Sequence, residues 1–133
     1  MLVHAGKTLF TEDELRCKGS GLLILAPGFD LELLKLRVAF DMPMSVNSCC
    51  RSESHNRAVG GHPRSLHVCD KPYWPTGGCC SIDVGTRHRG EGYRQKLIKL
   101  AESLNWSVGI HPHFIHLDRR VDYTSRPRAT FPY

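Results

Sequence analysis

Two histidines and one aspartate stand out as side chains that together could hold a metal ion: His67, Asp83 and His116. Two imidazole nitrogens and one carboxylate oxygen would give a tetrahedral zinc three protein ligands and leave one position for water. This pattern is typical of a catalytic zinc rather than a closed structural one. A water at that position can act as a nucleophile near neutral pH. Any one of these residues alone more often has a structural or surface role, so their grouping depends on the motifs described below.

The sequence around Asp83 and His116 is typical of β-strands. Residues 79–84 predict a strand that presents Asp83 at its end. Residues 114–117 alternate in polarity, which places His116 and Asp118 on one face of a second strand and apolar side chains on the other. We therefore expect two of the three candidate ligands on strands.

Three segments have helical patterns. Thr11 begins a capping-box sequence. Asp30 is placed to cap a second helix, which Pro43 would end. Residues 93–104 carry apolar side chains close to i, i+3, i+4, i+7 spacing and predict a third helix.

Short strands are also predicted at residues 44–47 and 106–110. Between them, residues 49–76 are polar, lack periodicity and are rich in Gly, Pro, Ser and His. Loops this long in a compact domain are usually functional or disordered, and the histidines and arginines favour function. Residues 123–133, within a C-terminal extension that begins at residue 119, predict an extended or mobile tail.

The length of 133 residues fits one domain, with a core at about residues 10–118 and the tail as an extension. Hydrophobic residues make up 41% and charged residues 23%, which indicates a globular chain. The mixture of elements predicts an α+β fold, with a small antiparallel sheet and helices packed on one side.

The formal charge of +5 favours polyanionic partners such as an acidic polymer or cell envelope. The basic residues are mostly scattered, so we expect no specific nucleic-acid partner. The opening residues are too short and polar for a secretory signal, and no apolar stretch reaches membrane-spanning length. The expectation is a monomer made in the cytoplasm.

Six cysteines are present, and none is paired as Cys-x-x-Cys, the usual half of a structural zinc site. In a reducing compartment we expect them to be buried as small hydrophobic side chains. Cys69 and either Cys79 or Cys80 form the most interesting pair, because they bracket an aromatic loop.

The motif order along the chain resembles a known family. Residues 50–61 contain an arginine, His-Asn and Gly-Gly, and they lead into the Ser-x-His of Ser65 and His67. Residues 114–118 read Phe-Ile-His-Leu-Asp, and residues 10–15 resemble an opening helix. Together they resemble the zinc D-alanyl-D-alanine carboxypeptidases and related murein endopeptidases, in their short, single-domain, often phage-borne branch.

This resemblance implies the fold of the D-Ala-D-Ala carboxypeptidases, also called hedgehog-like, with one zinc at the sheet edge. It implies the ligands His67, Asp83 and His116 and a metallopeptidase that cuts peptidoglycan stem peptides. Such an enzyme would be a D,D-carboxypeptidase or an endolysin that a phage holin releases to the cell wall. The rival interpretation is a non-catalytic zinc-containing binding module of the same fold, for example a cell-wall or phage structural component.

One departure concerns the segment between the first histidine and the aspartate. The family has His-x-x-Gly-x-Ala-x-Asp, whereas residues 68–82 separate the two here. Asp70 is therefore a rival carboxylate, although the strand context favours Asp83. Tyr73 and Trp74 in this insertion would form a substrate lip, or would pack within their own loop.

The resemblance also implies roles around the metal. Related peptidases carry a glutamate three residues before the last ligand, where this chain has His113, which we expect to transfer the proton, with His111 as a weaker candidate. Arg51 resembles the arginine that holds a substrate carboxylate or polarises the scissile carbonyl, or it braces the loop. Ser65 would orient the site, and Asp118 would support a ligand imidazole or pair with a neighbouring arginine.

Overall fold

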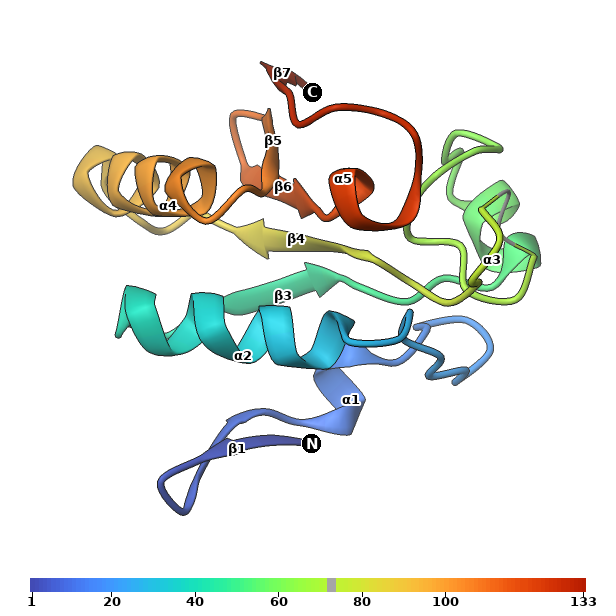
Figure 1. The fold of residues 1–133 in the computed structure, drawn as a ribbon, viewed down its shortest axis with the longest axis horizontal. Coiled ribbons are helices and arrows are strands. Elements are labelled where there is room, and N and C mark those ends of the chain that lie inside the picture. Colours follow the sequence, from blue (N-terminus) through green and yellow to red (C-terminus); the bar gives the residue numbers. More distant parts are fainter. Residues whose placement is uncertain (72–73) are drawn as a thin grey trace.

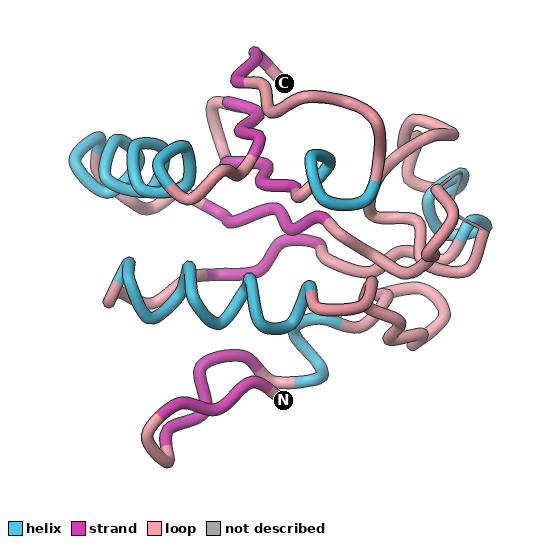
Figure 2. The backbone as a smooth tube through the Cα atoms, viewed as in Figure 1, coloured by secondary structure: helices cyan, strands magenta, loops and turns pink. Residues whose placement is uncertain are grey.

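The computed structural model describes residues 1–71 and 74–133. Its helices are α1 (Glu12–Leu15), α2 (Phe29–Phe40), α3 (Glu53–Ala58), α4 (Glu91–Ser103) and α5 (Arg120–Tyr123). Its strands are β1 (Leu2–His4), β2 (Lys7–Phe10), β3 (Ser45–Ser48), β4 (Ser81–Gly85), β5 (Ser107–Ile110), β6 (Phe114–Asp118) and β7 (Thr130–Pro132). Figure 1 shows these elements in chain order, and Figure 2 shows that most of the chain between β3 and β4 is loop.

The main sheet has the strand order β3-β4-β6-β5-β7. The pairs β3–β4, β4–β6 and β5–β6 are antiparallel, whereas β7 lies parallel to β5. The long helices α2 and α4 contact each other and share one hydrophobic core with the inner strands. The predicted α+β architecture with helices on one side of a small sheet is confirmed, except that the tail adds a parallel strand.

The alternation of β4 and β6 divides the sheet into an apolar and a polar face. Ile82, Ile115 and Leu117 are fully buried in the core with α2 and α4. Side chains at alternate positions must therefore point to the other face, where Asp83 and His116 lie. The fold thus places the two candidate ligands opposite the helices.

The helix starts show where local sequence is decisive. At α1, Thr11 and Glu14 form the predicted capping box. The prediction that Asp30 caps α2 is wrong, because the helix begins earlier at the left-handed Gly28 (φ +84°), whose carbonyl accepts a hydrogen bond from the Glu32 amide. Asp30 instead lies in the first turn, where a carboxylate is favourable.

Five elements were not predicted: α3, β1, β2, α5 and β7. The aperiodic loop contains α3, which Ser52 caps by accepting a hydrogen bond from the His55 amide. Six residues are too few for a hydrophobic period to show. A hairpin of β1 and β2 precedes α1, and the tail forms α5 and β7. Within the described residues, no helix is long and apolar enough to cross a membrane.

Candidate metal centre

The antiparallel register of β4 and β6 places Asp83 directly opposite His116. Their side chains meet on the polar face, with 2.9 Å between Asp83 Oδ1 and His116 Nδ1. Both strands are inner strands of the sheet, so the expected position at the sheet edge is corrected to the sheet face. Asp83 also lies within β4 rather than at its end.

His67 reaches the same point from the loop that precedes β4. Its Nε2 lies 3.2 Å from Asp83 Oδ1, and the ring is completely buried. The loop is fixed because the Arg51 amide donates to the His67 carbonyl and the Ser65 hydroxyl accepts from the His67 amide. The candidate ligand atoms of His67, Asp83 and His116 all lie within 4.8 Å of one another.

The partners of each imidazole fix which nitrogen faces the centre. His67 Nδ1 lies 2.6 Å from the Cys49 carbonyl, which only accepts, so Nδ1 carries the hydrogen. His116 Nε2 lies 2.8 Å from Asp118 Oδ2 and donates to it in the same way. With neutral rings, the remaining nitrogen of each imidazole therefore turns a lone pair toward Asp83.

This donor set fits a divalent cation. Two nitrogen lone pairs and a carboxylate oxygen approach one another closely, an arrangement that repels unless a positive charge lies between them. Ligands about 2.0–2.1 Å from a tetrahedral zinc are separated by about 3.3 Å, close to the distances found around Asp83. The hydroxyl of Ser81 also lies 3.1 Å from His67 Nε2 and 3.4 Å from His116 Nδ1.

The electrostatics favour an ionised carboxylate. Burial alone would raise the pKa of Asp83, but when the rings of His67 and His116 are protonated, their charge and hydrogen bonds hold it well below its usual range. Burial lowers the pKa of His67. Burial acts in the same direction on His116, but hydrogen bonds to Asp118 and Asp83 raise its pKa.

Asp118 links the site to a buried arginine. Arg120 donates to both of its carboxylate oxygens, at 2.9 Å and 2.7 Å. Burial raises the pKa of Asp118, but these hydrogen bonds and the one from His116 lower it to about 2. The carboxylate therefore stays charged and holds the His116 ring in one orientation, as such partners do at metal sites.

Arg51 is positioned beside the second oxygen of Asp83, at 3.4 Å. Its other guanidinium nitrogens donate to Ser48 Oγ and to Asn56 Oδ1, and its side chain is 13% exposed. Asn56 in turn donates to the His62 carbonyl. Arg51 therefore orients Asp83 and braces the loop. It lies next to the three candidate ligands and is still partly exposed to solvent.

A pocket of 560 Å³ opens beside His116. The ring of Tyr133 stacks on the His116 ring, with centroids 4.7 Å apart and planes inclined by 16°. Residues from the loop and from the tail line this pocket: His62, Arg64, Ser65, Leu66, His116, Arg120, Arg126, Phe131 and Tyr133. The tail thus builds one wall of the hollow next to the candidate metal.

The structure places the remaining candidates in different environments. Ser65 lines the pocket. Trp74 packs in the hydrophobic core at 3% exposure, which corrects the expectation that it forms a surface lip. Tyr73 lies outside the described residues. Asp70 accepts a hydrogen bond from the Glu53 amide at the start of α3, so Asp83 and not Asp70 faces the two histidines.

His113 lies in the exposed turn between β5 and β6. It is three residues from His116, which corresponds to about 10 Å along an extended strand. Its amide donates to His111 Nδ1, and the His111 ring stacks on Phe114, which contacts Tyr133 edge-on. The His111 ring is therefore linked to His116 through the rings of Phe114 and Tyr133.

Sequence reasoning missed Ser81 and Tyr133 as parts of the site. It offered the pairing of Asp118 with Arg119 or Arg120 only as an alternative to the support of His116, whereas Asp118 contacts both His116 and Arg120. Ser81 could have been found from period-two alternation with Asp83. Arg120 follows Asp118 by two residues, a spacing that allows the ion pair but does not require it. Nothing local indicates that Tyr133 stacks on His116, because that contact depends on the pairing of β7 with β5.

Comparison with known proteins adds one finding. The family model described as Peptidase M15 matches residues 10–118. This range includes His67, Asp83 and His116 and excludes the tail that lines the pocket. A search of curated proteins found no match.

Proposed function

The chain belongs to the Peptidase M15 family, which implies a zinc metallopeptidase, and from this premise we propose that it hydrolyses stem peptides of peptidoglycan. The observation that carries the proposal is the convergence of His67, Asp83 and His116 within 4.8 Å beside an open pocket. The two activities that fit are those of a D,D-carboxypeptidase and of an endopeptidase of the endolysin type.

A bound zinc ion would polarise the scissile carbonyl and lower the pKa of a water molecule. The protein's own residues then divide the remaining work. Asp118 keeps His116 in the tautomer that presents Nδ1, and the Cys49 carbonyl does the same for Nε2 of His67. Arg51 holds Asp83 in place and offers its guanidinium to a substrate carboxylate or to the developing oxyanion.

Proton transfer is assigned to His113, with His111 as the alternative. A neutral imidazole can take a proton from the attacking water, and the imidazolium can return it to the leaving amine. His113 lies in an exposed turn. Catalytic hydrogen bonds are often long in the absence of substrate and shorten only when it binds. His111 already lies against the aromatic rings that lead to His116.

The pocket supports an anionic peptide as substrate. It is lined by Arg64, Arg120 and Arg126, and the chain carries a formal charge of +5. Stem peptides carry free carboxylates, and the wall around them is acidic, so a positive surface would attract the substrate. We place the protein's action at the cell wall, with release by a phage holin as the route for an endolysin.

The test is mass spectrometry of muropeptides after purified peptidoglycan is incubated with zinc-loaded protein. Loss of a terminal D-alanine would indicate a carboxypeptidase, and separated cross-links or stems would indicate an endopeptidase. Peptidoglycan that binds the protein yet stays intact with zinc, cobalt and manganese would contradict hydrolysis. That result would instead support a binding module that keeps the metal site.

A further inference from the structure

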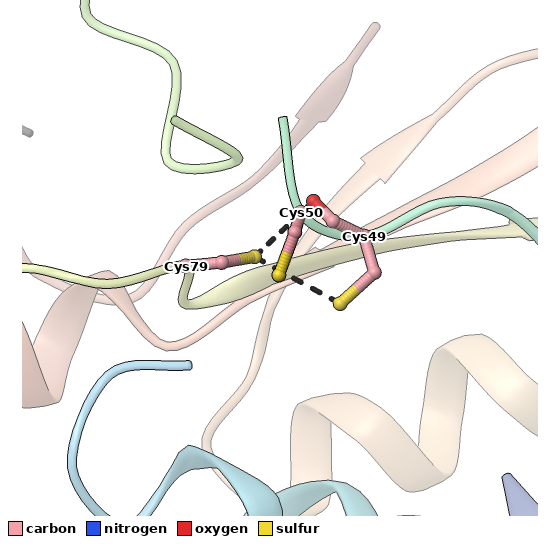
Figure 3. A group of neighbouring side chains, drawn as sticks. All are labelled: Cys49, Cys50 and Cys79. Atoms are coloured by element: carbon pink, nitrogen blue, oxygen red, sulfur yellow. Dashed lines mark hydrogen bonds between the residues drawn. The ribbon is translucent and has the colours of Figure 1, made fainter. Parts of the chain in front are cut away.

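A group of cysteines lies directly behind His67, and we propose that it binds a second zinc ion whose role is structural. Cys49, Cys50 and Cys79 are at most 1% exposed. Their sulfur atoms all lie within 4.8 Å of one another, and Figure 3 shows the three side chains directed toward a common point. We call these three residues the cysteine cluster.

The spacing of the sulfurs matches a metal site. Cys49 Sγ and Cys79 Sγ are 3.8 Å apart. Two thiolates bound to a tetrahedral zinc at about 2.3 Å are separated by about 3.8 Å. A disulfide would require about 2.05 Å, and all the described cysteines are free.

The backbone holds the cluster in place before any metal binds. The chain bends at Cys49, which lets two consecutive side chains turn to the same side. The Cys50 amide donates to the Leu15 carbonyl, and the Cys79 amide donates to the Ile24 carbonyl. Because these bonds come from separate parts of the chain, the cluster is part of the fold and not of a flexible loop.

Cys69 supplies a fourth sulfur. It is 3% exposed, and its thiol interacts with the Cys50 thiol. It is not within the close group of three, so a change of its side-chain rotamer must accompany metal binding. Four cysteine sulfurs give the closed tetrahedral site that is typical of structural zinc.

A metal ion would also change the protonation of the cluster. Without a metal, cysteine side chains that are buried in this way pack as neutral thiols, like small hydrophobic side chains. Zinc binding would release their protons and stabilise the fold, because the unfolded chain has no such site.

The cysteine cluster shares one atom with the candidate catalytic site. The carbonyl oxygen of Cys49 accepts from His67 Nδ1 at 2.6 Å and from the Cys79 thiol at 3.2 Å. Fixing Cys49 therefore fixes the orientation of His67. Zinc in the cysteine cluster would act as a positioning device for a ligand of the other zinc.

The test is the zinc content of protein that has been refolded with zinc and freed of excess metal. We expect two zinc ions per chain in the natural sequence, one in His116→Ala and one in Cys79→Ser. With cobalt in place of zinc, His116→Ala should keep strong thiolate-to-cobalt charge-transfer absorption, and Cys79→Ser should lose it. The matched control is Cys80→Ser, which changes the adjacent buried cysteine outside the cluster and should leave both readouts unchanged.

Three results would overturn the proposal. They are an absence of metal in His116→Ala, unchanged thiolate absorption in Cys79→Ser, and a Cys49–Cys79 disulfide found by peptide mapping. If Cys79→Ser does not fold, zinc-edge absorption spectroscopy of His116→Ala decides instead. A first shell of sulfur supports the site, whereas a shell of only nitrogen and oxygen contradicts it. The outcome is independent of hydrolysis, because no peptidoglycan is present.

Discussion

Two metal-competent groups in the described part of the chain both adjoin the Cys49 carbonyl, and they differ in donor atoms and in access to solvent. His67, Asp83 and His116 offer nitrogen and oxygen atoms on a sheet face, beside a pocket. The cysteine cluster offers sulfur atoms and is closed within the core. The difference suggests a division of labour: a group with a free coordination position next to a pocket suits catalysis, and a closed thiolate group suits stability.

The supporting bonds differ in the same way. Each imidazole of the first group has its outer nitrogen fixed, by the Cys49 carbonyl or by Asp118. The sulfurs of the cysteine cluster contact mainly one another and nearby carbonyls. Variants that affect one group and spare the other can therefore separate activity from folding.

The largest effect is expected for His116→Ala. Removing one of three ligands should remove the metal and lower kcat/KM at least about 10³-fold, because several kcal/mol of charge stabilisation are lost. The measurement is peptide hydrolysis together with zinc content. His4→Ala, an exposed histidine on β1, is the control and should retain full activity. Peptide hydrolysis that persists in His116→Ala would contradict the assignment of catalysis to the group of His67, Asp83 and His116.

His113→Ala should lower kcat about 10²-fold or more with unchanged zinc content, since general acid–base groups contribute about 10²–10⁴-fold. His111→Ala is the companion variant. If only His111→Ala loses activity, the proton-transfer role passes to that residue. Full activity in the double variant would show that neither histidine moves the proton.

Arg51→Lys keeps the positive charge but loses the guanidinium fork that contacts Ser48, Asn56 and Asp83. We expect kcat/KM to fall about 10²-fold, the size of effect seen when one oxyanion donor is removed. Zinc content should stay at the natural level. A loss of metal without a separate loss of turnover would mean that Arg51 only braces Asp83.

Asp118→Asn should weaken zinc binding at the histidine site about 10–100-fold, since the residue orients His116. In the metal-free protein it should also lower stability with a defined pH dependence. The folded pKa of about 2 lies below the unfolded value of about 3.9, so the carboxylate stabilises the fold above about pH 4. That contribution, about 2.6 kcal/mol, is lost as the pH falls toward 2.

The check on this pH dependence is urea unfolding of both proteins at about pH 6 and about pH 3. The difference in unfolding free energy should narrow at the lower pH. A constant difference would show that the ionised form of Asp118 does not account for its effect.

The smallest effect is expected for Tyr133→Ala. The stacked ring is worth about 0.5–1.5 kcal/mol, so KM should rise about threefold to tenfold while zinc content stays unchanged. Tyr133→Phe keeps the ring and should behave like the natural protein. If KM rises as much in Tyr133→Phe as in Tyr133→Ala, the hydroxyl and not the ring contributes to substrate binding.

Much of the inner sheet could be predicted from the sequence because the evidence is local. The alternation of polar and apolar residues around His116 correctly predicted the sheet face on which it lies, and the capping box at Thr11 correctly predicted the start of α1. The N-cap of α2 is Gly28 and not the predicted Asp30, because a left-handed backbone conformation at the cap depends on how the preceding segment enters the helix. The helix propensities of the residues do not reveal the direction of that segment.

The parts that escaped prediction depend on long-range pairing. The stacking of Tyr133 on His116 requires β7 to pair with β5, more than twenty residues away. Cys49 and Cys79 meet only because β3 and β4 are neighbours. Trp74 could not be assigned to core or surface from its own loop, because its burial depends on the elements that pack around it.

The most direct test of the central claim is a crystal structure of the zinc-loaded protein, with anomalous diffraction recorded at the zinc edge. We predict a peak about 2.0–2.2 Å from His67 Nε2, Asp83 Oδ1 and His116 Nδ1, with a fourth position facing the pocket. A zinc-loaded crystal without a peak between these three atoms would contradict it.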